Sequence, residues 1–351
     1  MMANLMNAAA TAEETDNKAL TERLKAYALT LGFDACGVAR VDPEIDPDDI
    51  FGAWLAAGYH ADMTWLERTK AMRQNPRLHL PGAESVVVVA HNYYTRGETG
   101  KDEPSQTGQS AKVARYAWGR DYHRVMPKRL HRLGRFLQAE RPGSEYVISV
   151  DAGPFLERAW AARAGIGWIG KNSLVLRRDL GSWFFLGLVL TTVELVPDAA
   201  LPEACGSCRA CIDACPTGAI VSEKIVDSRR CISYHTIENS ADIPRTIQTA
   251  MGPWIFGCDI CQEVCPWNRF ARETAETDYT PRIPGGKLDP IELLRLSEDE
   301  FDRRFSGSPL RRAKYRGMRR NASIIIRNLG MAVPDGTIDT NPVPTEQTLD
   351  K

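Results

Sequence analysis

Length, composition and charge narrow the possibilities at once. With 351 residues, the chain is long enough for about two domains. Its 43% hydrophobic and 25% charged residues are the ordinary balance of a globular protein, which excludes a wholly disordered, collagenous or coiled-coil chain. The formal net charge of -1 gives no overall attraction to nucleic acid, so such binding requires a local basic patch.

The sequence contains no segment that predicts membrane insertion or export. Its longest apolar runs, Ser85–Ala90 and Trp183–Leu190, are far shorter than the roughly 20 residues that span a bilayer. Residues 1–18 lack the features of a signal or transit peptide and are predicted to be a disordered leader. We therefore expect a cytoplasmic protein without membrane contact.

Secondary-structure elements are predicted in an irregular order. A helix at 20–31 ends before Gly32, a residue type that suits a C-cap. Further patterns predict helices at 123–140 and 155–164, strands at 84–90, 145–151 and 182–193, and a flexible loop at 97–110. Because there is no regular βαβ repeat, we expect an α+β domain at 19–196, built on a mixed sheet flanked by helices.

Three further segments are predicted after this domain. Pro197 and Pro202 mark the boundary before the cysteine-rich residues 197–285, which we expect to form a ferredoxin-like domain. Residues 286–331 are predicted to be a basic helical segment. Residues 332–351 are predicted to be a disordered tail.

Eight of the nine cysteines lie between positions 205 and 265. In a reducing compartment such a cluster indicates a metal centre rather than disulfides. The first run has the spacing of bacterial ferredoxins, Cys205-x2-Cys208-x2-Cys211-x3-Cys215-Pro216. A partial second copy follows, Cys258-x2-Cys261-x3-Cys265-Pro266, and the nearby cysteine that can complete it is Cys231.

This pattern predicts two 4Fe-4S clusters. By the ligand exchange of two-cluster ferredoxins, one cluster takes Cys205, Cys208, Cys211 and Cys265, and the other takes Cys215, Cys231, Cys258 and Cys261. Structural zinc is an alternative because it also uses paired Cys-x2-Cys. Zinc has no need, however, of a third cysteine at the same spacing or of two Cys-Pro endings. The ninth cysteine, Cys36, is interpreted as a small buried hydrophobic residue.

A second candidate site follows the strand that ends at Asp151. A Gly-Pro turn and a helix come next, and then the glycine-rich loop Gly165–Lys171. An acid at the C-terminal edge of a strand beside such a loop is where open α/β sheets bind ligands. The simpler interpretation is that Asp151 organises the turn and the glycines only bend the chain.

Several segments together resemble the epoxyqueuosine reductases, enzymes of tRNA modification that are related to cobalamin-dependent reductive dehalogenases. The resemblance is carried in family order by Arg115–His123, Val150–Asn172, Cys205–Ala219, Arg230–Glu238, Gly257–Trp267 and Arg311–Ala322. It implies a cobalamin bound to the α+β domain and two 4Fe-4S clusters in the ferredoxin-like domain. It further implies reduction of epoxyqueuosine to queuosine at the wobble position of tRNAs with a GUN anticodon, with release of water.

The resemblance also implies residue roles. The family's proton donor falls on Asp151, and we expect burial against Phe155, Trp160 and Trp168 to keep this carboxyl neutral. The cobalamin contacts of the family fall on Arg73, Ala114, Asp151, Leu156, Val175, Leu186 and Ser233. His123 is not assigned to cobalt, because Met126 replaces the glycine of the corresponding signature. His235 is expected near the second cluster, where it could contact a cofactor or tRNA, and its simpler interpretation is an exposed loop histidine.

A basic stretch near the C-terminus is the predicted tRNA contact. It contains Arg311, Arg312, Lys314, Arg316, Arg319 and Arg320. Tyr315 is available there to stack on a base. The chain stops soon after this helical region, whereas some family members continue with helical repeats.

Partners and rival functions complete the expectations. We expect a monomer that receives electrons from a small redox protein such as a ferredoxin or flavodoxin. One rival is a cobalamin-dependent reductive dehalogenase-like enzyme that acts on a small molecule. The other is a non-enzymatic two-cluster electron carrier, which would bind no corrinoid tightly.

Overall fold

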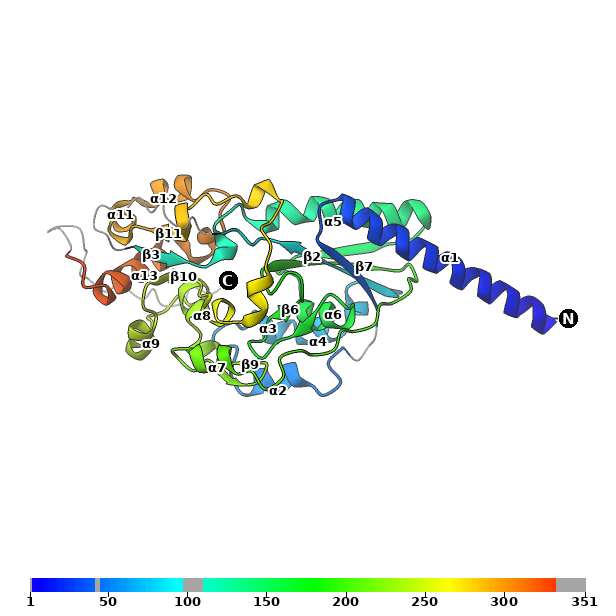
Figure 1. The fold of residues 1–351 in the computed structure, drawn as a ribbon, viewed down its shortest axis with the longest axis horizontal. Helices are drawn as coiled ribbons and strands as arrows, with labels where there is room; N and C mark the ends of the chain where they lie inside the picture. Colours follow the sequence, from blue (N-terminus) through cyan, green and yellow to red (C-terminus); the bar gives the residue numbers. More distant parts are fainter. Residues whose placement is uncertain (1, 42–44, 97–109, 333–351) are drawn as a thin grey trace.

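The computed structural model describes residues 2–41, 45–96 and 110–332, with side chains from residue 14 onward. A four-stranded sheet and its covering helices form one end of an elongated molecule (Figure 1). Short C-terminal helices form the other end, and the cysteine-rich loops lie between and below them (Figure 1). The predicted loop at 97–110 and tail at 332–351 fall, but for one residue each, outside the described residues.

The main sheet has the strand order β1-β2-β7-β4. Its strands are β1 (Ala35–Arg40), β2 (Ser85–Asn92), β7 (Phe184–Thr191) and β4 (Tyr146–Ser149). Every neighbouring pair is antiparallel, so the prediction of a mixed sheet is wrong for this domain. The spacing of elements along a chain does not fix strand direction, because a long connection can return to either end of a sheet.

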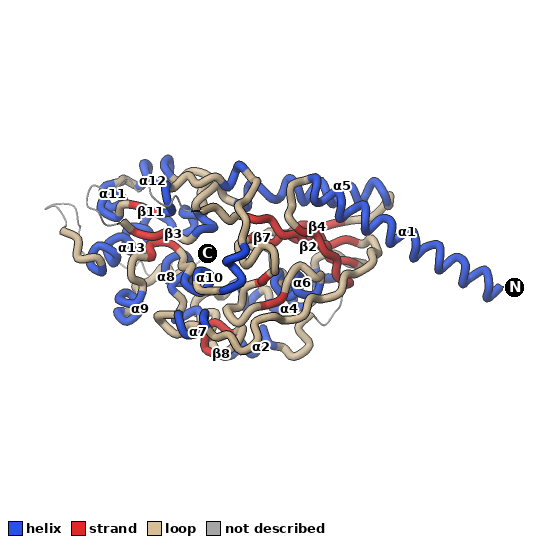
Figure 2. Tube along the Cα trace, viewed as in Figure 1, coloured by secondary structure: helices blue, strands red, loops and turns tan. Residues whose placement is uncertain are grey.

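Strand β2 shows why this sheet is buried on both faces. Its valines alternate, with Val87 and Val89 packing in one hydrophobic core and Val86 and Val88 in another. Successive side chains of a strand point to opposite faces. An uninterrupted valine run therefore requires helices on both sides of the sheet, and Figure 2 shows the strands between helices.

One face is covered by α1 (Met2–Thr30) and α5 (Tyr122–Glu140), whose Leu24 and Leu130 pack against it. The other face is covered by α6 (Glu157–Arg163) through the fully buried Trp160. The predicted disordered leader at 1–18 is corrected, because α1 is helical from Met2 onward. This segment is rich in Ala and Met, which are strong helix formers, and it continues directly into the amphipathic part of the helix.

Several short elements were not predicted. Besides β1, they include α2 (Ile50–Ala56), α3 (Trp65–Arg68) and α4 (Lys70–Gln74), and the hairpin of β5 (Trp168–Ile169) and β6 (Val175–Leu176). The cysteine-rich region adds α7 (Ala210–Ala214), α10 (Ile260–Glu263) and the hairpin of β8 (Ile220–Ser222) and β9 (Ile225–Val226). Elements of two to seven residues carry too few periodic positions for a pattern to show.

A second sheet joins segments that the sequence had assigned to different domains. β3 (Ala111–Val113) pairs in parallel with β10 (Trp254–Phe256) and antiparallel with β11 (Lys287–Leu288). The core around this sheet is completed by α8 (Ile232–Ile237), α9 (Arg245–Ala250), α11 (Pro290–Arg295), α12 (Glu298–Arg304) and α13 (Lys314–Asn328). Residues 111–118 thus belong to the C-terminal core.

None of the helices in the described residues is long and apolar enough to cross a membrane.

Candidate active site and cysteine centres

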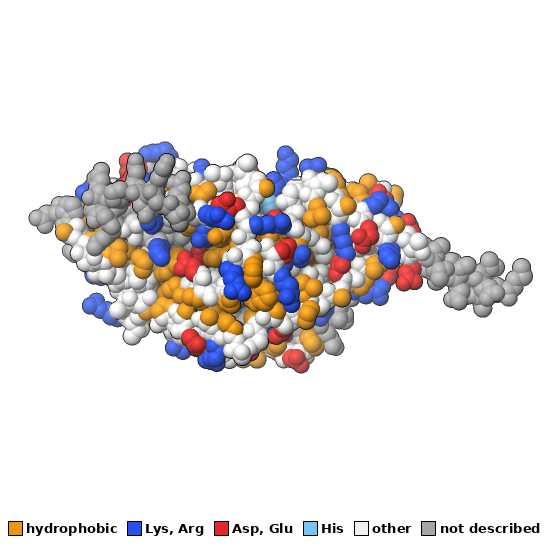
Figure 3. Space-filling model, in the orientation of Figure 1, with side chains coloured by type: hydrophobic (Ala, Val, Ile, Leu, Met, Phe, Trp, Pro, Cys, Tyr) orange, Lys and Arg blue, Asp and Glu red, His pale blue; other side chains and the backbone are white. Residues whose placement is uncertain are grey.

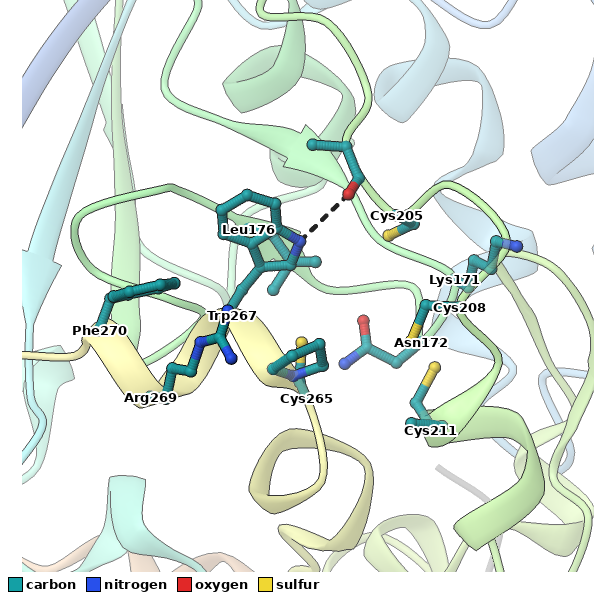
Figure 4. A pocket seen from close by; sticks show the side chains of 13 residues that line it. Lys171, Asn172, Leu176, Cys205, Cys208, Cys211, Cys265, Trp267, Arg269 and Phe270 are labelled. Atoms are coloured by element: carbon teal, nitrogen blue, oxygen red, sulfur yellow. Dashed lines mark hydrogen bonds between the residues drawn. The ribbon is translucent and has the colours of Figure 1, made fainter.

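The four thiols assigned to the first cluster line one cavity (Figure 4). The cavity measures about 210 Å³ and is lined, among others, by Cys205, Cys208, Cys211 and Cys265. Organic ligands usually occupy roughly 300–1,000 Å³, so this space suits a compact inorganic cluster. Four converging thiols are also the donor set that 4Fe-4S clusters require. The prediction that Cys265 crosses over to the first run therefore agrees with the cavity.

The second set of thiols lies deeper. Burial raises the pKa of Cys261 first, and the charges of Cys258 and Cys231 raise it further. Burial likewise raises the pKa of Cys231, with a further contribution from Cys215. These electrostatic effects place the four thiols in one group. Cys211 of the first set also affects Cys261, so the two groups are neighbours.

Single-ion binding is not indicated by these sets. Within residues 2–41, 45–96 and 110–332, no three His, Cys, Asp or Glu side chains converge closely enough to hold one metal ion. A structural zinc needs four ligands around a single ion. The motif itself favours iron-sulfur clusters over zinc, with its third cysteine at the same spacing and its two Cys-Pro endings.

The second cysteine loop is attached to the segment before α5 by a buried acid. Asp259 lies between Cys258 and Cys261, and its carboxylate accepts a hydrogen bond from the backbone N–H of Arg115 at 2.6 Å. Burial raises the pKa of Asp259 to about 6. Gly257, with a φ of +67°, leaves no room for a side chain, because a Cβ there would come within 2.5 Å of the Ala114 Cβ. This close approach sets Tyr116 beside the second cysteine loop.

Asp151 lies just after β4 in an unusual backbone conformation. Its φ of +55° is in the left-handed region, which few residues other than Gly, Asn and Asp adopt without cost. The backbone N–H of Asp151 donates to Glu157 Oε1 at 2.7 Å, and the Ser149 hydroxyl donates to the same oxygen at 3.2 Å. Glu157, in the first turn of α6, therefore holds the turn that presents Asp151.

Two side chains from the start of α5 approach the Asp151 carboxylate. The Tyr122 hydroxyl donates to Oδ2 at 2.6 Å, and His123 Nε2 lies 3.7 Å from the same atom. Burial and then the charge of Asp151 raise the pKa of Tyr122, so Tyr122 remains a neutral donor. Burial alone would lower the pKa of His123, but its hydrogen bond to Asp121 and the charges of Asp121, Asp151 and Glu157 raise it.

The expected apolar burial of Asp151 is not found. The Asp151 side chain is 64% exposed, whereas Phe155, Trp160 and Trp168 are buried inside the protein. The strand edge projects the acid outward, while the rings point into the core. The carboxyl whose pKa is raised is Glu157, because its burial and then the negative charge of Asp151 bring that pKa to about 8. A glutamate two residues after an aromatic one gave no sequence signal of this role.

The residues predicted to contact cobalamin fall into two groups. Arg73 lies near Asp151, donates to the Phe155 carbonyl at 3.0 Å, and has its pKa lowered by burial against the opposing charges of Glu157 and Asp151. Val175 is buried in the core under α6, and Leu156 and Leu186 pack against that core. Ala114 is buried in the C-terminal core and Ser233 lies on α8. Leu156 and Leu186 are only partly buried and Arg73 adds a half-buried cation, a chemistry that suits an amphipathic cofactor, whereas Val175 and Ala114 are enclosed in the two cores. The cobalamin contacts stay a prediction.

The basic residues near the C-terminus differ in whether their charged groups already have partners within the protein. Arg320 donates to the backbone carbonyls of His235, Asn239 and Ala241, so its guanidinium is occupied within the protein. Tyr315 donates to the Leu296 carbonyl and is only partly exposed, which corrects its predicted availability for stacking.

The remaining cations of this stretch lie at the surface or in ion pairs. Arg311 pairs with Asp302 at 3.0 Å, and Arg312 pairs with Glu238 at 2.7 Å. Arg319 donates to the Tyr315 hydroxyl. Lys314 and Arg316 are exposed.

His235 also departs from its prediction. It lies on α8, is only 3% exposed, and its ring nitrogens contact the Arg229 carbonyl and Asn239. It is therefore a structural residue rather than an exposed loop histidine.

Comparison with known proteins identifies the family. A profile described as a 4Fe-4S double cluster binding domain matches residues 204–268, and one described as epoxyqueuosine reductase QueG, DUF1730, matches residues 73–152. The epoxyqueuosine reductase of Gloeobacter violaceus is 42% identical over 86% of this chain and 93% of its own length. The chain belongs to the epoxyqueuosine reductase family. It is accordingly an oxidoreductase, and its cysteine-rich segment binds two 4Fe-4S clusters.

Solved structures of epoxyqueuosine reductases share this fold. One, with a tRNA-Tyr epoxyqueuosine-modified tRNA stem loop, has a TM-score of 0.82 and 30% identity over 90% of this chain and 82% of that one. Another, from Bacillus subtilis with its catalytic aspartate loop swung out of the active site, has a TM-score of 0.81 and 30% identity over 88% of this chain and 82% of that one.

The ligand assignment of this epoxyqueuosine reductase family member is testable at Cys231. Anaerobically reconstituted wild type should contain about eight irons in two cubes. Cys231→Ala removes a ligand of the second cluster only, so iron and acid-labile sulfide should fall toward about four per chain. Cys36→Ala is the matched control, and it should keep the wild-type content. Full iron content in the Cys231 variant would contradict the assignment.

The raised pKa of Glu157 predicts a pH-dependent stability. Glu157 keeps its proton in the folded state up to a pKa of about 8, compared with 4.5 for a free side chain. Because the folded state then binds more protons, the free energy of unfolding should fall between about pH 5 and 8, by at most about 1.4 kcal/mol per pH unit. Glu157→Gln removes this titration.

Thermal midpoints of the two proteins across that pH range measure the effect. The wild-type midpoint should decline relative to that of Glu157→Gln as the pH rises. Parallel curves would show that Glu157 titrates normally.

Proposed function

We propose that this protein reduces epoxyqueuosine in tRNA to queuosine, with Asp151 as the proton donor. The reaction consumes two electrons and two protons, and the epoxide oxygen leaves as water. The observation that carries the proposal is the presentation of Asp151, an exposed carboxyl held on a left-handed turn by Glu157. Membership of the epoxyqueuosine reductase family and the similarity to the tRNA stem-loop complex support it.

Asp151 is surrounded by groups that can manage a proton. Tyr122 fixes one carboxylate oxygen by its hydrogen bond. His123, whose pKa is raised by its hydrogen bond to Asp121 and by nearby acidic charges in spite of its burial, lies within 3.7 Å of the same oxygen. A protonated His123 can replace the proton that Asp151 gives to the leaving oxygen. This supply route takes the place of the apolar burial that the sequence had suggested.

Cobalamin is the cofactor that we propose for the reducing step. When bound, it would supply a low-valent cobalt centre that takes electrons from the clusters. The residues that would hold it are Arg73, Leu156, Val175 and Leu186 beside Asp151, with Ala114 and Ser233 on the side of the C-terminal core. The half-buried Arg73 guanidinium suits a corrin amide or the nucleotide phosphate.

The basic stretch lies close enough to Asp151 to guide the tRNA. The hydrogen bond to Glu238 raises the pKa of Arg312, and the charge of Asp151 adds to this effect. The Arg312 guanidinium also lies over the Trp65 ring, 5.8 Å from its centroid. These contacts support the proposal that the exposed cations next to Arg312 bind phosphates while the wobble nucleoside reaches Asp151.

Substitution of Asp151 tests the chemistry. Asp151→Asn should keep both clusters, because asparagine also tolerates the left-handed conformation. Turnover with chemically reduced enzyme should fall about 10²- to 10⁴-fold, the usual contribution of general acid catalysis. Nucleoside mass analysis of epoxyqueuosine-containing tRNA measures the product. Full turnover in Asp151→Asn would remove this residue as the acid.

Substitution of Lys314 and Arg316 tests the tRNA contact. The double variant Lys314→Ala, Arg316→Ala should bind tRNA more weakly, and its binding should lose roughly one unit of salt slope per phosphate contact removed. Arg245→Ala, on the exposed start of α9, is the control and should bind as the wild type does. Filter binding at several salt concentrations gives both numbers. Unchanged affinity in the double variant would assign these cations to solvation alone.

A further inference from the structure

A surface beside the first cysteine set has no role in the chemistry described so far. Among the cluster cysteines, Cys208 is exposed and the other seven are partly buried. Cys208 belongs to the first set, and all four thiols of that set line one cavity. Electrons from outside therefore have an exposed entry at the first set.

Two arginines flank this entry point without acidic partners in the described part of the chain. The Arg178 guanidinium lies over the Trp267 ring, 5.3 Å from its centroid, and the Arg269 guanidinium lies over the Phe270 ring at 4.8 Å. Arg269, Trp267 and Phe270 also line the cavity of the first cysteine set (Figure 4). The positive charges of Arg178 and Arg269 thus lie beside the cavity of the first cysteine set.

Neighbouring charges leave this surface positive. Lys171 pairs with Glu223 at 2.7 Å, and Arg209 pairs loosely with Asp213 at 3.6 Å. Glu263 on α10 is an exposed acid between Cys261 and Cys265, and it offsets one of these positive charges. On the face shown in Figure 3, both basic and acidic side chains surround hydrophobic ones near the middle.

Phe270 adds an apolar contact to these charges. Its side chain is 51% exposed, although it lies on the short helical turn Pro266–Phe270 that directly follows the ligand Cys265. An exposed aromatic side chain bordered by arginines is typical of protein interfaces, where Arg and aromatic residues are enriched. A small-molecule reductant would need no such surface.

We propose that Arg178, Arg269 and Phe270 form the docking surface for an acidic one-electron carrier protein. This inference rests on the proposed function, in which each product requires two electrons. In each encounter the reduced carrier loses one electron and the first cluster gains it, so two encounters complete one turnover. The complementary charges steer the encounter, and Phe270 contributes an apolar contact in the docked complex.

Cluster reduction without tRNA tests the docking surface directly. The probe is a reduced flavodoxin of net negative charge, mixed with oxidised, cluster-loaded protein while the cluster absorbance is followed. Arg178→Glu, Arg269→Glu should lower the second-order rate constant at least about tenfold at low salt and flatten its salt dependence. Phe270→Ala should lower the rate at both low and high salt. Binding of oxidised flavodoxin should weaken in the same variants.

Three controls separate docking from other effects. The double variant Arg245→Glu, Arg295→Glu reverses two exposed charges elsewhere. Flavodoxin should reduce its clusters as fast as it reduces those of the wild type. Photoreduced deazaflavin should reduce the clusters of every variant equally and should support equal epoxyqueuosine turnover. If that turnover fails in the wild type, the proposed function is wrong and the docking result still stands.

Two outcomes would overturn the docking proposal. One is an unchanged flavodoxin rate in the charge-reversal variant. The other is a loss of tRNA binding or of self-association in that variant at a normal flavodoxin rate, which would assign the surface to tRNA or to a second copy of this chain.

Discussion

The hydrogen bond between the Arg115 amide and the buried Asp259 carboxylate connects the second cysteine loop to the segment that leads to the Asp151 site. Asp259 lies between two predicted ligands of the second cluster, and Arg115 precedes the helix that carries Tyr122 and His123. Gln262 donates to the other oxygen of this carboxylate, so loss of the Arg115 bond would leave Oδ2 without this donor inside the protein. The buried side chain thereby holds the cysteine loop to the backbone of the segment that leads to Tyr122 and His123.

The same contact explains why the domains are not simple consecutive blocks. Residues 111–118 leave the main sheet, add β3 to the sheet of β10 and β11, and pack in the C-terminal core. Tyr116 then lies between the two regions, 6.0 Å from the Phe256 ring and 6.4 Å from the Tyr122 ring. A movement of the cluster loop would be transmitted to the Tyr122 hydroxyl that fixes Asp151. The interleaved chain therefore connects the second cysteine loop to the turn that carries Asp151.

Prediction from sequence succeeded where local spacing carries the information. The β2 valine run and the α5 periodicity are local patterns, and the structure contains both elements. Cys265 lines the same cavity as Cys205, Cys208 and Cys211, and its role as a ligand of the first cluster stays a prediction. Strand direction and the partner of β3 depend on contacts between distant segments, so no local pattern could reveal them.

The role of Glu157 was hidden for a different reason. Glu157 is separated from Asp151 by one helical entry turn, and only the left-handed conformation of Asp151 brings its amide to the Glu157 carboxylate. Burial beside the negative charge of Asp151 raises the pKa of Glu157 to about 8, an effect that depends on the folded turn and not on any local pattern. The exposed Asp151 carboxylate faces Tyr122 and His123, while a protonated Glu157 limits the number of negative charges at the turn. One carboxyl is therefore presented at the surface while the other holds the left-handed turn in place.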